Sequence, residues 1–81
     1  MAKITVVSPI PGVFYRRPSP DQEPYIQEGE PVKKGETVGL VEVMKNYYEI
    51  KAEADGILER FLVENEGIVE AGQVIALIET E

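Results

Sequence analysis

The sequence predicts an all-β fold, a flattened barrel or sandwich of two four-stranded antiparallel sheets. Apolar residues show no helical period in any window of about ten residues or more. Short runs rich in β-branched and aromatic residues alternate instead with turn signals that contain glycine. The second half of the chain also repeats the pattern of the first. Since neither half has enough strands for a core of its own, we expect the halves to interleave about a quasi-two-fold axis.

The expected strands are short and are separated by proline or glycine. Two prolines and a glycine within residues 8–12 end the first strand, because proline cannot donate to a sheet ladder. Three prolines within residues 17–24 exclude helix and central strand, so a loop is expected at about residues 17–25. Turns that contain glycine separate the later strands. The expected strands are residues 3–7, 13–16, 25–27, 37–43, 47–52, 57–64, 68–69 and 74–79.

An internal repeat relates the two halves. Residues 32–42 align with residues 69–79 at an offset of 37, which matches Gly35 with Gly72 and places apolar residues opposite one another. Residues 11–14 align with residues 55–58 at an offset of 44, so the first half carries about seven extra residues. These fall between Gly12 and Gly35, where the proline-rich loop lies. The loop is therefore an insertion in one of two similar four-strand halves.

The composition excludes several classes of function. The 81 residues, expected to form a single domain (1–81), include no cysteine and no histidine. This removes thiolate chemistry and the usual general base at neutral pH, so we expect no catalytic and no metal-ligating residue. A net charge of −7 without a basic stripe argues against nucleic acid as a partner. With no apolar run near the roughly 20 residues of a membrane span and no signal peptide, we expect no membrane partner and a cytoplasmic location.

The stretch Glu42-Val43-Met44-Lys45-Asn46 lies at the junction of the two halves. Strand-like runs flank it on both sides, so Lys45 is expected at the tip of a hairpin with its amine in water. Asn46 suits a positive-φ position of a two-residue hairpin turn. Acylation of a lysine amine gives a stable amide and removes the charge. Lys45 is therefore the candidate attachment site for a carried group.

The neighbours of this stretch have expected places as well. Met44 is expected to cap the hairpin with its apolar side chain. Tyr47 and Tyr48 alternate faces on a strand, so one is expected in the core and the other on the surface. By the internal repeat, the turn equivalent to the hairpin falls near the C-terminus. The chain ends are therefore expected far from Lys45.

The motif around Lys45 resembles the biotin-attachment motif, in which a small apolar residue, a methionine and the modified lysine lie on a tight hairpin. Residues 8–16, 18–21, 49–56 and 62–67 likewise resemble the biotin carboxyl carrier domain of bacterial acetyl-CoA carboxylase, and the likeness covers residues 8–78. The resemblance implies that biotin is attached covalently to Lys45, within an attachment motif of Glu42, Val43 and Met44. It also implies that the proline-rich loop is a "thumb" beside the biotin. The chain departs from the family at Asn46, where methionine is usual, and at Arg17, where a small hydroxyl residue is common.

The resemblance also implies a function and a set of partners. A biotin protein ligase joins biotin to Lys45, and a biotin carboxylase then carboxylates the biotin with ATP and bicarbonate. A carboxyltransferase passes the carboxyl group to an acceptor, expected to be acetyl-CoA, which gives malonyl-CoA for fatty acid biosynthesis. The domain itself is then a non-catalytic carrier.

Two alternatives stay open. A lipoyl carrier domain has the same fold, but typically places aspartate before the lysine and alanine after it, where this chain has Met44 and Asn46. The other alternative is an unmodified structural or interaction domain that keeps the fold.

Overall fold

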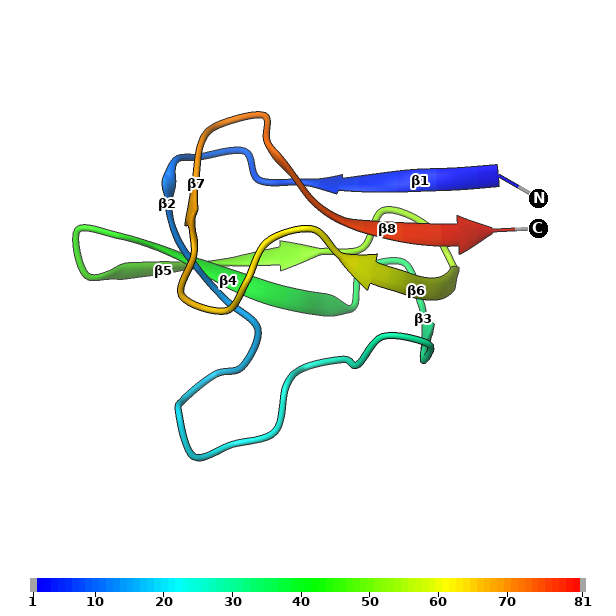
Figure 1. Cartoon of the computed structure of the whole chain (residues 1–81), viewed down its shortest axis with the longest axis horizontal. Helices are drawn as coiled ribbons and strands as arrows, with labels where there is room; N and C mark the ends of the chain where they lie inside the picture. Colours follow the sequence, from blue (N-terminus) through cyan, green and yellow to red (C-terminus); the bar gives the residue numbers. More distant parts are fainter. Residues whose placement is uncertain (1, 81) are drawn as a thin grey trace.

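The structure, a computed structural model, describes residues 2–80 as a flattened sandwich of eight β-strands (Figure 1). Two four-stranded sheets form it, with the strand orders β1-β8-β6-β3 and β5-β4-β2-β7, and every pair of neighbours is antiparallel. The predicted fold class is confirmed. Across residues 2–80 no helix is long and apolar enough to cross a membrane. The strands are β1 (Ala2–Val7), β2 (Gly12–Tyr15), β3 (Pro31–Val32), β4 (Thr37–Val43), β5 (Asn46–Lys51), β6 (Gly56–Phe61), β7 (Ile68–Val69) and β8 (Val74–Thr80).

Each sheet takes strands from both halves of the chain. Exchanging β1 with β5, β2 with β6, β3 with β7 and β4 with β8 converts the order of one sheet into that of the other. The repeat in the sequence is therefore a two-fold relation between the two sheets. The expected interleaving is confirmed, and it means that neither half completes a sheet without strands of the other.

The core lies between the sheets and follows the same two-fold relation. Phe14 and Leu58, at the offset of 44, are both fully buried. The matched pairs at the offset of 37 that point inward are also buried; they are Val32 with Val69, Val38 with Ile75 and Val41 with Ile78. Leu40 and Leu77 break the symmetry, since Leu40 is buried and Leu77 is half-buried. The core is thus built from equivalent positions, and the difference in burial between Leu40 and Leu77 lies outside it.

The proline-rich loop accounts for that difference. The Tyr25 amide donates to the Arg16 carbonyl oxygen at 2.9 Å and closes the neck of the loop. In Figure 1 the loop extends away from the sheets below β4. The predicted strand at residues 25–27 is wrong: Ile26 is buried and anchors the loop, and β3 supplies the strand that pairs with β6. The predicted strand at residues 57–64 is too long, because β6 ends at Phe61.

The β4–β5 hairpin and the chain ends lie at opposite ends of the sandwich (Figure 1). The last β4–β5 pair is Val43 with Asn46, and its equivalent in the other sheet is Thr80 with Ala2. The hairpin turn therefore occupies the place where, in the other sheet, β1 begins and β8 ends. The expected separation of Lys45 from the termini is confirmed.

A packing difference between the halves leads to the first prediction. A Cβ atom on Gly39 would overlap the Phe14 ring. The equivalent position of the second half is Ala76, which is buried in a half that has Leu58 in place of Phe14. Gly39→Ala should therefore lower the free energy of unfolding by about 1–3 kcal/mol through overpacking.

In a Phe14→Leu background the cost of Gly39→Ala should fall by about 1 kcal/mol, since this pair reproduces the Leu58 and Ala76 of the second half. Urea unfolding of the four proteins of this double-mutant cycle measures the coupling. An equal cost in both backgrounds would contradict the packing argument.

Candidate functional site

The candidate site is built on the two-residue turn between β4 and β5. The strands pair down to Val43 with Asn46, which leaves Met44 and Lys45 as the turn. Both turn residues have positive φ, 51° for Met44 and 68° for Lys45. Such a turn matches the right-handed twist of the paired strands, although residues with a Cβ atom adopt it at a cost. The predicted hairpin with Lys45 at its tip is confirmed.

The expectation for Asn46 is wrong. Asn46 is the first residue of β5 and closes the turn by pairing with Val43, so it does not occupy a positive-φ position. The register places Met44 and Lys45 there instead, although asparagine tolerates positive φ better than either. The pairing of the flanking strands therefore decides the register against the local preference.

The Lys45 side chain is exposed at the apex of the turn. Among residues 2–80 its ammonium group takes part in no ion pair. Acylation of this amine would therefore break no electrostatic contact within that part of the domain. Its backbone, by contrast, is held by the ladder on either side. The arrangement presents an accessible amine from a fixed point.

The side chains around Lys45 are more exposed than the sequence predicts. Met44 is 89% exposed, so its expected role as an apolar cap is wrong. Tyr47 and Tyr48 are both exposed, although one of them was expected in the core. Tyr48 is paired with the buried Val41, yet Ile50 is the one buried residue of β5. The tip of the hairpin thus extends beyond the facing sheet, and no core is available there.

The other two motif residues hold the base of the turn. Val43 is half-buried and packs against the core. The Glu42 carboxylate accepts a hydrogen bond from the Tyr15 hydroxyl group at 3.1 Å, and the Tyr15 ring lies 6.5 Å from that of Tyr47. The pKa of Tyr15 is raised above its usual value, first by this hydrogen bond and then by desolvation and nearby carboxylates. Tyr15 thus links β2 to both strands of the hairpin.

A hollow of about 280 Å³ separates the proline-rich loop from this face of the sheet. Tyr15, Leu40 and Tyr47 contribute from the sheet. Sequence reasoning missed Tyr15, Asn65 and Glu66 as neighbours of the site. The alternation of side chains within β2 could have placed Tyr15 on the face opposite the core. The packing of the loop over that face depends on long-range contacts, which a local sequence pattern does not predict. The remaining lining residues are Arg17, Pro18, Ser19, Pro20, Asn65 and Glu66.

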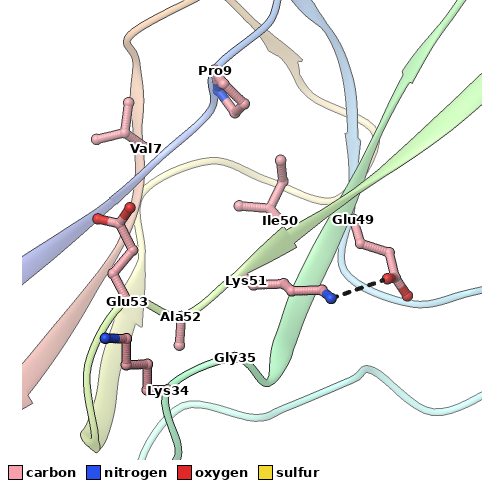
Figure 2. A pocket seen from close by; sticks show the side chains of 9 residues that line it. All are labelled: Val7, Pro9, Lys34, Gly35, Glu49, Ile50, Lys51, Ala52 and Glu53. Atoms are coloured by element: carbon pink, nitrogen blue, oxygen red, sulfur yellow. Dashed lines mark ion pairs between the residues drawn. The ribbon is translucent and has the colours of Figure 1, made fainter.

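A second hollow, of about 670 Å³, lies at the end of β5 away from Lys45 (Figure 2). It opens between the edge strands β1 and β5, with Val7 and Pro9 on one side and Ile50 on the other. The Lys51 ammonium group lies 3.9 Å from the Glu49 carboxylate at its rim. Its lining residues include none of residues 42–46.

Comparison with known proteins assigns the chain to a family. The family model described as "Biotin-requiring enzyme", the biotin/lipoyl family, matches residues 4–78. The chain belongs to this family. The resemblance noted in the sequence is confirmed.

Relatives of this biotin/lipoyl domain carry a more specific name. The biotin carboxyl carrier protein of acetyl-CoA carboxylase from Porphyra purpurea is 43% identical over 94% of this chain and 48% of its own length. The proteins of the same name from Streptococcus pyogenes and Pseudomonas aeruginosa are each 42% identical over 90% of this chain, and over 44% and 47% of their own lengths. The chain therefore spans about half the length of the curated relatives it matches.

Solved structures share the fold of this biotin/lipoyl domain. The Kluyveromyces lactis urea carboxylase aligns over 98% of this chain and 6% of its own, with a TM-score of 0.81 and 26% sequence identity. The succinylglutamate desuccinylase/aspartoacylase from Rhodobacter sphaeroides aligns over 91% of this chain and 21% of its own, with a TM-score of 0.65 and 27% identity. The same sandwich thus occurs within much longer chains.

The positive φ of Lys45 makes a prediction about stability. Lys45→Gly should raise the free energy of unfolding by about 1 kcal/mol, because glycine adopts the left-handed conformation without steric cost. Lys51→Gly, within β5, is the matched control and should lower it by roughly 0.5–1 kcal/mol. Urea unfolding of both variants provides the measurement, and a similar loss for the two would show that Lys45 is not strained.

Proposed function

We propose that this domain is a biotin carboxyl carrier of acetyl-CoA carboxylase, with biotin attached to Lys45. The exposed Lys45 amine at the apex of the two-residue turn carries the proposal, because it offers one nucleophile at a fixed place. The names of the relatives support the choice of biotin and of acetyl-CoA carboxylase. The domain contributes presentation and reach, and turnover belongs to its partner enzymes.

The residues around Lys45 fit a bulky attached group. The exposed Met44 leaves the apex open to a ligase, and the Lys45 side chain is free to move once acylated. The hollow beneath the thumb loop lies on the face of Tyr47, two residues along the hairpin from Lys45. Tyr15 and Tyr47 offer aromatic faces there, and Arg17 offers hydrogen-bond donors. We infer that these residues hold the head group when the loop acts as a thumb.

The proposed partners follow from this role. A biotin protein ligase forms the amide at Lys45, in which the amine becomes uncharged. When bound, biotin supplies a ureido nitrogen that takes up a carboxyl group at a biotin carboxylase and releases it at a carboxyltransferase. With acetyl-CoA as the acceptor the product is malonyl-CoA, a precursor of fatty acids. We further propose a cytoplasmic location and no nucleic-acid or membrane partner.

Intact-mass measurement tests the attachment. The full chain is produced with a biotin protein ligase and added biotin, beside Lys45→Arg and Lys51→Arg. One biotinyl increment is expected on the unaltered chain and on Lys51→Arg, and none on Lys45→Arg. A lipoyl increment in cells that hold both ligases would assign the domain to lipoyl carriage, and an unmodified chain would contradict the carrier proposal.

A further inference from the structure

Two equivalent rows of side chains cross the two sheets, one at each end of the sandwich. The hairpin-end row follows the register from β7 to β5. The terminus-end row follows the register from β3 to β1. The two-fold relation between the sheets superimposes the rows, position by position. In that order, the hairpin-end row is Ile68, Val13, Glu42 and Tyr47, and the terminus-end row is Pro31, Ile57, Glu79 and Lys3.

The hairpin-end row lies on the outer face of its sheet. Each of its members on β2, β4 and β7 is next in sequence to a buried core residue; these residues are Phe14, Val41 and Val69. Since side chains alternate along a strand, the row points away from the core. Ile68 is 80% exposed and Tyr47 is 61% exposed. The row reaches the attachment hairpin at Tyr47, two residues from Lys45.

The terminus-end row shows that the fold does not require these exposed apolar groups. Where the hairpin end has Ile68, the terminus end has Pro31, and where it has Tyr47, the terminus end has Lys3. Proline and lysine are residues that proteins place on sheet edges to prevent association. Lys3 also forms an ion pair with Glu59 at 3.0 Å. At the two outer positions of the rows, exposed apolar side chains therefore occur only at the end that carries Lys45, as expected for a contact surface, whereas the position of Val13 and Ile57 is apolar in both rows.

Carboxylates surround the hairpin-end row. Glu42 lies within it, and Glu66 and Glu70 each stand two residues from Ile68. Glu66 and Glu42 both add to the field that raises the pKa of Tyr15. A second copy of this chain, which has a net charge of −7, would bring like charges together. A surface with basic side chains around an apolar patch is complementary.

We propose that the hairpin-end row is a docking surface for the biotin carboxylase, which presents an apolar patch bordered by lysine and arginine side chains. This inference rests on the proposed carrier function. Because the head group of biotin is uncharged before it is carboxylated, it cannot itself guide the arm to this enzyme. The carboxylates of the carrier then steer the encounter, and Ile68 contributes the buried contact.

Kinetics with purified biotin carboxylase test the surface. The fully biotinylated chain is varied as the substrate, and ATP-dependent carboxylation is measured for the unaltered chain, Ile68→Ser and Ile57→Ser. Ile57, 41% exposed, belongs to the terminus-end row and is the matched control. Ile68→Ser should raise KM about fivefold with kcat within about twofold, as expected for a lost contact of roughly 1 kcal/mol. Ile57→Ser should leave both values unchanged.

A second variant distinguishes the loss of the Ile68 contact from misfolding. Ile68→Pro introduces the residue that the equivalent position, Pro31, already has. The backbone hydrogen bonds beside the two positions are equivalent. Phe14 N–H donates to the Gly67 carbonyl oxygen at 2.8 Å, and Leu58 N–H donates to the Glu30 carbonyl oxygen at 2.9 Å. Ile68 and Val13 are therefore a non-hydrogen-bonded pair, and proline at 68 removes no ladder bond. Ile68→Pro should raise KM as Ile68→Ser does.

Other results would overturn the inference. Equal KM values for Ile68→Ser and Ile57→Ser would show that the row does not dock. A rise in KM only with the carboxyltransferase would assign the row to that enzyme. Self-association in sedimentation experiments that Ile68→Ser abolishes would assign it to a second copy. If the unaltered chain is not biotinylated at all, the proposed function fails and this inference fails with it.

Discussion

The structure depends on the β4–β5 ladder, whose turn carries the chain from its first half into its second. These strands pair without interruption from Gly39 with Ile50 to Val43 with Asn46, and a two-residue turn closes them. Because each sheet needs strands from both halves, the ladder pairs the last strand of the first half with the first strand of the second half within one sheet. The turn must therefore be tight, and it places two residues with side chains at positive φ. Strain is thus located at the residue that the proposed function uses, as is common at functional sites.

The internal two-fold relation separates what the fold needs from what the function needs. Equivalent positions in the core are apolar in both halves, because both sheets face the same interior. Outside the core the halves differ at the proline-rich loop, which has no counterpart of its length in the second half. They also differ at the exposed residues beside the hairpin. Both differences lie near Lys45 rather than near the chain ends. A domain with two similar ends has therefore become specialised at one of them.

Much of the fold follows from the sequence, and the departures have physical causes. The strands 37–43 and 68–69 have the predicted bounds, because glycine turns and β-branched runs mark both. The strand at 25–27 was wrong because one buried residue, Ile26, anchors a loop as readily as a strand. The alternation of side chains along a strand predicts the face on which Tyr48 lies, but not how far the facing sheet extends. The burial of one of the two tyrosines was therefore mispredicted. The hollow beside Tyr15 depends on how a loop packs over a sheet, a long-range contact that no local pattern encodes.

The central claim is that a group held by Lys45 carries a carboxyl group between two enzymes. The most direct test follows ¹⁴C from bicarbonate in a mixture of biotin carboxylase, carboxyltransferase, ATP, acetyl-CoA and the biotinylated chain. The account predicts labelled malonyl-CoA that requires this chain and is absent when Lys45→Arg replaces it. Labelled product with Lys45→Arg, or none with the fully biotinylated chain, would contradict the account.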